Sequence, residues 1–328
     1  MAASTHCQER PPRWETGVGF RIAYAIHAYQ KPQQLARLVH RLCGAEAGFF
    51  IHIDRRKGIA PFQNALRREP TSITFVKRAA SAWGTVGEVR MRLNLMAAVL
   101  GAPVKYDYVV ILSGQDYPIK PNRGIVSFLA QNRKRNFVHH ERMPTSFWSV
   151  NGGDGGMWLI DRYHVDFLGK RISYPPTCER PDTRKGRAFI AVANFLCALR
   201  FRMPRLFPSY LVPYGGSAHL SLTREAVRYV LDFVEQHPDY LRFHRYTLNS
   251  SEIFFHTILL NAPEYLRCSI VNDNLHYESW VHTAHPEILT TRDLPELRST
   301  SKPFARKFDT DVDSEVLDLL DQDAREGR

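Results

Sequence analysis

The chain has 328 residues, of which 44% are hydrophobic, 12% aromatic and 23% charged, and it carries a net charge of +11. This length is enough for one large or two small domains, and this composition supplies the core of a globular protein. The positive charge favours anionic partners, which include nucleotides, phosphorylated carriers, nucleic acid and acidic membrane surfaces.

The cysteines and the apolar segments exclude several classes of protein. The five cysteines are widely spaced, odd in number and never in a CxxC pair. This spacing argues against a zinc site and a disulfide framework, and it favours a reducing compartment. Residues 1–19 have no signal-peptide pattern and are expected to be irregular, and no run of about 20 apolar residues predicts a spanning helix. We therefore expect a cytoplasmic protein, either soluble or peripheral at the inner face of the membrane.

The first third of the chain alternates between strand and helix patterns. Residues 21–27 are typical of a buried strand, Pro32 opens a helix that ends by Gly44, and residues 49–53 form a second strand. The next elements predicted are a strand over 73–76, a long helix over 87–100 and a strand apolar on both faces over 108–112. Strands and helices in this order predict an α/β fold with a mostly parallel sheet.

Polar side chains follow two of these strands. Asp54 comes directly after the second strand, and Asp116 follows the strand over 108–112. Open α/β sheets bind ligands just beyond the carboxyl ends of their strands, which makes both residues candidates for a binding site. The alternative for each is a structural Asp in a turn or at a helix N-terminus.

The pattern changes after residue 142. Residues 151–156 form a glycine-rich loop, and residues 161–215 are rich in Arg, Pro and Tyr without a clear period. Within them, residues 188–199 are nearly all apolar and precede Arg200, Arg202 and Arg205. A buried helix with a basic end is the favoured interpretation. The alternative is a helix at a membrane interface, with its arginines toward lipid phosphates.

Glu252 is the best candidate for a general base. It lies at the start of a predicted helix, where the macrodipole should keep a carboxylate ionised. The alternative is a Glu that only caps the helix. We predict one catalytic domain over 20–315, with a nucleotide-binding half over 20–142 and an acceptor half over 143–315, followed by a tail over 316–328.

Arg306 and Lys307 lie between Phe304 and Phe308. The rings favour burial whereas the charges need water or an anion, and a diphosphate suits adjacent guanidinium and ammonium groups. The alternative is a helix start whose phenylalanines pack while the cations extend into solvent. The acidic residues that follow, from Asp309 onward, suit a helix N-terminus better than a metal site.

Several familiar motifs are missing. The chain has no GxxxxGK[ST], GxGxxG, GxSxG or HExxH, which excludes the P-loop, the dinucleotide fingerprint, the nucleophile elbow and the zinc-protease helix. The basic residues do not gather on one helix with interleaved aromatics, which argues against a nucleic-acid partner.

Six separated motifs together resemble one family, the core-2/I-branching β-1,6-N-acetylglucosaminyltransferases with the related peptide O-xylosyltransferases, which form family 14 of the glycosyltransferases. In the order of that family, the motifs are 51–54 (IHID), 83–84 (WG), 112–118 (LSGQDYP), 216–218 (GSA), 251–257 (SEIFFHT) and 304–309 (FARKFD). The resemblance covers about residues 20–315.

This resemblance implies a GT-A type fold and inverting transfer from a UDP-sugar, with no metal and no other cofactor. It implies that Glu252 deprotonates the acceptor hydroxyl and that Arg306 and Lys307 hold the departing diphosphate, where fixed positive charge replaces a metal ion. It also implies a nucleotide and donor site at His27, Asp54, Trp83 and Asp116, and a donor-sugar or acceptor region at Gly216, Ser217 and His219.

Two departures bear on the donor sugar. The xylosyltransferase pattern resembles Gly-Ser-Asp-Trp at this motif, whereas this chain has Ala218 and His219 after Ser217. The missing Asp favours the pattern of the branching enzymes. A second upstream cation has no firm match, although Arg292 lies near. We therefore expect transfer of N-acetylglucosamine to a glycan, lipid-linked saccharide or peptide. The resemblance to the animal enzymes does not extend to their membrane anchor and several disulfides, so we expect a bacterial-type enzyme. The alternatives are a UDP-xylose-dependent O-xylosyltransferase and a non-catalytic nucleotide-sugar-binding scaffold of polysaccharide assembly.

Overall fold

A computed structural model describes residues 19–69, 71–146, 148, 153–176, 183–280 and 286–327. Residues 1–18 of the expected irregular N-terminus, and part of the predicted loop over 151–156, lie outside these ranges.

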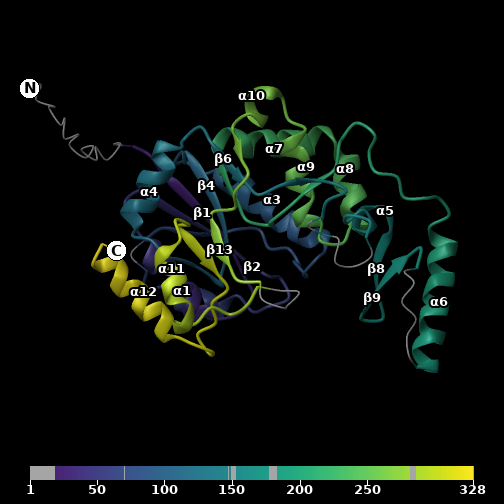
Figure 1. Ribbon diagram of the computed structural model, residues 1–328, viewed down its shortest axis with the longest axis horizontal. Helices are drawn as coiled ribbons and strands as arrows, with labels where there is room; N and C mark the ends of the chain where they lie inside the picture. The colour runs from purple at the N-terminus through teal and green to yellow at the C-terminus, as the bar shows by residue number, and fades with distance from the viewer. Residues whose placement is uncertain are drawn as a thin grey trace, which may run out of the picture.

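Strands and helices alternate through the first part of the chain, as predicted (Figure 1). They are β1 (Ile22–Ala28), α1 (Pro32–Leu42), β2 (Ala47–Ile53), α2 (Ala60–Leu66), β3 (Ile73–Phe75), α3 (Val86–Leu100), β4 (Tyr108–Ser113), β5 (Asp116–Pro118), α4 (Asn122–Gln131), β6 (Asn136–Val138) and β7 (Glu141–Arg142).

The remainder is richer in short elements. They are α5 (Trp158–Asp161), β8 (Tyr163–Phe167), β9 (Lys170–Tyr174), α6 (Arg184–Arg200), β10 (Tyr214–Gly215), β11 (Leu220–Thr223), α7 (Arg224–Gln236), α8 (Pro238–Phe243), α9 (Phe254–Leu260), α10 (Glu264–Arg267), β12 (Ile270–Val271), β13 (His276–Glu278), α11 (Leu294–Ser299), β14 (Phe304–Arg306) and α12 (Glu315–Arg325), with 3-10 helices η2 (His244–Tyr246), η3 (Ser250–Glu252) and η4 (Thr291–Asp293).

A seven-stranded sheet forms the centre of the molecule, in the order β12-β6-β11-β4-β1-β2-β3. All neighbours are parallel except β11, which runs antiparallel to both β4 and β6. The central strands β1, β2 and β4 are buried on both faces because helices cover both sides. The predicted α/β fold with a mostly parallel sheet is therefore confirmed.

Each face of the sheet has its own hydrophobic core. Alternate residues of β1 point in opposite directions, so Tyr24 and Ile26 pack toward α1, α2, α4 and α12, whereas Ala23 and Ala25 pack toward α3, α7 and α9. The small alanine side chains let α3 approach β1 closely. Both cores draw residues from either side of residue 142, so the two predicted halves are packed together.

A second, three-stranded sheet begins just beyond the carboxyl end of β4, in the order β13-β14-β5. Strand β14 pairs in parallel with β13 and antiparallel with β5. This small sheet joins a segment near the C-terminus to the segment that directly follows β4.

The C-terminal residues do not form the predicted tail. Helix α12 packs against the central sheet through Val316, Leu317 and Leu320, which are all buried. Its acidic residues pair with α1, where Arg37 donates to Asp318 and Asp321 at 2.7 Å each. The folded domain therefore extends at least to residue 325.

An arm composed of the β8–β9 hairpin and α6 projects from the body (Figure 1). Helix α6 matches the predicted apolar helix, but the favoured interpretation as a buried helix is wrong, because among its residues only Ala193 and Cys197 are buried. Arg205, which the alternative of a membrane interface would place toward lipid phosphates, is buried and donates to the carbonyls of Ile160 and Phe243 at 2.7 Å. No helix in the described ranges is long and apolar enough to span a membrane.

Candidate active site

The small sheet aligns three charged residues in one row. Its register places Asp116 on β5 opposite Arg306 on β14, and Arg306 opposite Glu278 on β13. Arg306 Nε donates to Asp116 Oδ1 at 3.1 Å. Residues that are far apart in the sequence are thus brought together by strand pairing alone.

Asp116 is buried and surrounded by hydrogen-bond donors. The backbone N–H and the hydroxyl of Ser113 each donate to its carboxylate at 2.6 Å, and Nε2 of His219 and of His276 lie 3.4 Å and 3.6 Å from Oδ2. Burial alone would raise the pKa of Asp116, but these imidazoles and Arg306 hold it well below its ordinary value. Asp116 is therefore a fixed buried anion.

His27 and His219 are neutral members of this cluster. Burial, with a smaller effect of His276, lowers the pKa of His219 to about 4. Burial also lowers the pKa of His27 well below its ordinary value, and Arg92 and Arg306 act in the same direction. Both rings are uncharged at neutral pH, so neither contributes a positive charge to the cluster.

Glu252 ends η3, and its backbone is fixed by the segment that precedes β11. Gly216 N–H donates to the carbonyl of Glu252 at 2.9 Å. A Cβ on Gly216 would lie 1.9 Å from the carbonyl oxygen of His139, so glycine is required at this position. Ser217 extends the same connection, because its hydroxyl accepts from Asn274 Nδ2 at 3.1 Å and its carbonyl contacts His256 Nε2 at 2.9 Å.

The protonation of Glu252 differs from the sequence-based expectation. The macrodipole was expected to keep its carboxylate ionised, but α9 begins only at Phe254, and the pKa of Glu252 is raised from 4.5 to about 8. Burial is the main cause, and the negative charges of Glu88 and Glu278 add to it, while Arg92 and Arg306 oppose it. Such a carboxylate is a stronger base than an ordinary Glu.

Sequence reasoning missed Glu88 and Arg92, which lie next to Glu252. Glu88 Oε2 accepts from Gly84 N–H at 3.0 Å and from Ser251 Oγ at 3.3 Å. Arg92, one turn further along α3, is buried, and its Nε has no hydrogen-bond partner among the described residues. The signal for the pair was its spacing of four residues, which places an acid and a base on the same face of the helix.

Gly84 explains the Trp-Gly motif. Its φ of +72° is in the left-handed region, and a Cβ there would lie 3.0 to 3.1 Å from side-chain atoms of Leu248 and Asn249. Glycine thus allows the start of α3 to contact the segment that carries Glu252. Trp83 itself is 59% exposed, and its carbonyl accepts from Arg171 of the arm at 3.2 Å.

The environment of Arg306 and Lys307 agrees with the predicted burial of the flanking phenylalanines. Phe304 and Phe308 are fully buried, as expected for anchors of the two cations, but the segment is a strand, so the alternative of a helix start is wrong. Lys307 is partly buried and forms no ion pair among the described residues, whereas Asp309 pairs with Lys31 at 2.7 Å. The binding of a diphosphate by the two cations stays a prediction.

Asp54 and Arg292 have different surroundings. The Asp54 carboxylate is buried and accepts from Arg56 and from the backbone and hydroxyl of Ser81 at 2.8 to 3.0 Å. Burial would raise the pKa of Asp54, but these hydrogen bonds hold it well below its ordinary value. Asp54 thus fixes the loop before Trp83, and its place in the nucleotide and donor site stays a prediction. Arg292 is exposed in η4.

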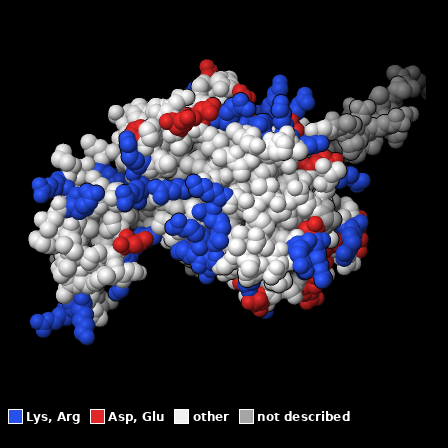
Figure 2. Space-filling model, turned by 180° about the vertical axis from the view of Figure 1, so that it is seen from behind, with Lys and Arg blue, Asp and Glu red and all other residues white. Residues whose placement is uncertain are grey.

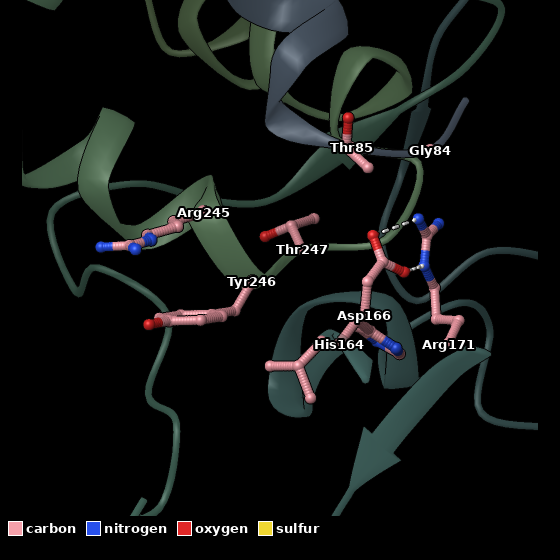
Figure 3. A pocket seen from close by; sticks show the side chains of 9 residues that line it. Gly84, Thr85, His164, Asp166, Arg171, Arg245, Tyr246 and Thr247 are labelled. Carbon is pink, nitrogen blue, oxygen red and sulfur yellow. Dashed lines mark hydrogen bonds and ion pairs between the residues drawn. The ribbon is translucent and has the colours of Figure 1, made fainter. Parts of the chain in front are cut away.

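A cavity of about 340 Å³ lies where the arm meets the body (Figure 3). Gly84 and Thr85 line it from the start of α3, Asp166 and Arg171 from the arm, and Arg245 from η2. Arg171 and Asp166 pair at 2.9 Å across the hairpin, and both lie at one side of the cavity. The cavity therefore opens beside the loop that joins Trp83 to α3.

The side chains of Asp116, His219 and His276 are of the types that bind divalent metals. Their ligand atoms lie within 4.8 Å of one another. However, both Asp116 oxygens already accept from Ser113, and the guanidinium of Arg306 contacts the same carboxylate. A cation beside Arg306 would be repelled, so these residues do not fit a metal ion well.

Comparison with known proteins identifies a family. A family model described as Core-2/I-Branching enzyme matches residues 22–152 and 178–298, which are more than half of the chain. These matched segments include Asp54, Asp116 and Glu252, but they end before Arg306.

Individual relatives carry a more specific name. Xylosyltransferase 2 of Rattus norvegicus is 29% identical over 331 residues, covering 92% of this chain and 33% of that protein. Xylosyltransferase 2 of Homo sapiens is also 29% identical, with 93% and 34% covered. Xylosyltransferase oxt of Drosophila pseudoobscura pseudoobscura is 28% identical, with 98% and 34% covered. The chain thus spans about a third of the length of these relatives.

Proposed function

The chain belongs to the Core-2/I-branching enzyme family of glycosyltransferases, and from this premise we propose that it transfers a sugar from a UDP-sugar to a hydroxyl group, with inversion and without a metal ion. The observation that carries the proposal is the position of Glu252. Its strongly raised pKa reflects a buried cluster that also contains Glu88, Arg92 and Arg306. A base and a fixed cation in one cluster are what such a transfer requires.

In the proposed reaction, Glu252 removes the proton from the acceptor hydroxyl as the oxygen attacks the anomeric carbon of the donor. The new carbon–oxygen bond forms on the face opposite the leaving group, so the configuration inverts. The bond to the diphosphate breaks, and its electron pair leaves with UDP. Arg306 and Lys307 stabilise the negative charge that develops on the diphosphate, which is the role a metal ion would otherwise have.

For the donor sugar, we propose xylose ahead of N-acetylglucosamine. The expectation of N-acetylglucosamine came from Ala218, which occupies the position where the xylosyltransferase pattern has an Asp. The relatives named above are xylosyltransferases, which favours the alternative donor. N-acetylglucosamine is the second candidate. With Ala218 in the 216–218 motif, Glu252 is the only carboxylate in that motif and the 251–257 motif together, as in the pattern of the branching enzymes.

We propose that the acceptor enters through the cavity between the arm and the body. Arg171 and Arg245 give this cavity a basic lining, and Tyr246 supplies an aromatic face of the kind that packs on sugars or peptides. Gly84 lines the cavity and also donates to Glu88, which contacts the Glu252 loop through Ser251. The cavity is therefore connected to the loop of the proposed base through Gly84, Glu88 and Ser251.

The test measures release of UDP and transfer of label from UDP-xylose and UDP-N-acetylglucosamine, with and without glycan or peptide acceptors. We expect turnover with one donor and a loss of about 100-fold or more in Glu252→Gln, since general bases contribute about 10² to 10⁴. Glu264→Gln, on the exposed side of α10, is the matched control. A chain that binds UDP but neither transfers nor hydrolyses any donor would support the scaffold alternative instead.

A further inference from the structure

Helix α6 presents a stripe of large apolar side chains to solvent. Val192, Phe195, Leu196 and Leu199 are 55%, 64%, 43% and 54% exposed. Their spacing of i, i+3, i+4 and i+7 places them on one face of the helix. Single exposed apolar residues are ordinary, but four adjacent ones on one helix face form a patch that is typical of an interaction site.

The adjacent face of α6 packs against the rest of the arm. Ala193 and Cys197 are buried, and the Phe189 ring lies 5.6 Å from that of Phe167 on β8. The hairpin thus covers one side of the helix and leaves the apolar stripe outward. Leu168 at the hairpin turn of the arm is also exposed, as are Met203 and Leu206 in the segment that follows α6.

Basic residues lie at both ends of this stripe. Arg184, Lys185 and Arg187 occupy the first turn of α6, and Arg200 and Arg202 lie at its end, while residues 184–206 contain no Asp or Glu. Figure 2 shows the same pattern, with Lys and Arg gathered at the tip of the arm and near its junction with the body, and uncharged surface between them. Cations in the first turn oppose the helix dipole, so an external anion would stabilise this end.

The basic residues of α6 favour an anionic membrane over a second copy of the chain as the partner of the apolar stripe. If a second copy packed its α6 on this one, basic ends would face basic ends in either the parallel or the antiparallel orientation, with no acidic residue on either helix to compensate. An anionic lipid surface complements the same pattern, because phosphates would meet the cations while the stripe enters the acyl boundary. At about 25 Å, a helix of this length suits a position flat in the interface.

We propose that α6 docks the protein on an anionic membrane surface, with Val192, Phe195, Leu196 and Leu199 entering the interface and the flanking cations contacting lipid phosphates. This docking is independent of the proposed sugar transfer, since none of these residues belongs to the candidate active site.

The test is flotation of the full chain with vesicles of phosphatidylcholine alone or mixed with phosphatidylglycerol, at low and high salt. We expect binding to the mixed vesicles, weak binding to the neutral ones, and release at high salt. Phe195→Glu combined with Leu199→Glu should lower the partition coefficient about tenfold or more for each residue. Arg184→Gln and Lys185→Gln should lower it about fivefold each.

The matched control is Tyr265→Glu, because Tyr265 is 62% exposed on α10, away from the arm. It should bind like the unaltered chain, and circular dichroism should show that every variant is folded. The proposal is overturned if no vesicle binds the chain or if Phe195→Glu with Leu199→Glu leaves binding unchanged. It is also overturned if light scattering detects a dimer that the double substitution dissociates while vesicles do not bind.

Discussion

The raised pKa of Glu252 predicts a specific pH dependence of turnover. The group is active as a base only when it is ionised, and with a pKa of about 8 roughly one-tenth of the free protein has an ionised Glu252 at pH 7. Because the folded-state pKa lies above the ordinary value, activity should increase as pH rises through 8. We expect kcat/KM to increase about tenfold between pH 7 and pH 9.

A substitution of Glu88 tests whether neighbouring charge contributes to the raised pKa of Glu252. Its negative charge raises the pKa of Glu252, while Arg92 and Arg306 lower it. Removing the charge by Glu88→Gln should therefore move the midpoint of the profile to lower pH and increase the relative activity at pH 7. The amide of Gln retains an oxygen that can accept from Gly84 N–H, so the loop contact has a replacement.

The assay is the initial rate of UDP release at low donor concentration between pH 5.5 and 9.5. His219, with a pKa of about 4, is not expected to titrate in the upper part of this range. Glu252→Gln should remove the rising limb along with most of the turnover. A flat profile between pH 6 and 9, or an unchanged midpoint in Glu88→Gln, would refute the reasoning.

Four further outcomes are expected. Lys307→Met should reduce turnover by about 100-fold to 1000-fold while UDP binding is weakened, as measured by kinetics and calorimetry. Exhaustive EDTA treatment should leave the rate unchanged, and dependence on added manganese would contradict the role of the fixed cations. Gly216→Ala should lower the free energy of unfolding by about 1 to 3 kcal/mol in urea titrations, because its Cβ would overlap a backbone carbonyl. Leu317→Ala should lower it by about 2 to 5 kcal/mol if α12 is part of the core, whereas no change would mark a dispensable tail.

The central sheet could be predicted because its signal is local. Strands β1, β2 and β4 are continuous apolar runs bounded by polar turns, and α1 and α3 lie between them at ordinary spacing. Burial on both faces leaves few other structures for such runs. The positions of Asp54 and Asp116 beyond the strand ends followed directly from this pattern.

Helices α12 and α6 were harder to predict because an amphipathic or apolar pattern does not say what the apolar face contacts. The acidic residues of α12 resemble a solvated tail, yet Asp321 accepts from Arg37 and from the Tyr117 hydroxyl, which are remote in the sequence. Helix α6 has the opposite property, since an apolar sequence that resembles a core helix remains exposed. In both cases the deciding partner is a tertiary contact that no local window contains.

The protonation of Glu252 also depends on tertiary contacts that the local sequence does not contain. Its position after two serines suggested a helix start and an ionised carboxylate. The pKa depends instead on burial and on Glu88, which reaches Ser251 from a helix far earlier in the chain. The motif therefore suggested Glu252 as a candidate base, whereas only the fold determines its protonation.

In the proposed reaction, the pairing of Arg306 with Asp116 would give the two cations different roles at the diphosphate. Arg306 donates to Asp116 through Nε alone, and a guanidinium has four further N–H donors at its two terminal nitrogens. Asp116 can thus orient the guanidinium without preventing it from meeting phosphate oxygens, and Ser113 keeps the carboxylate in place. A lysine has a single ammonium group, so a lysine at position 306 that paired with Asp116 would have no separate donors directed at the phosphate. Lys307, without an ion pair among the described residues, can act as the second, mobile charge on a diphosphate.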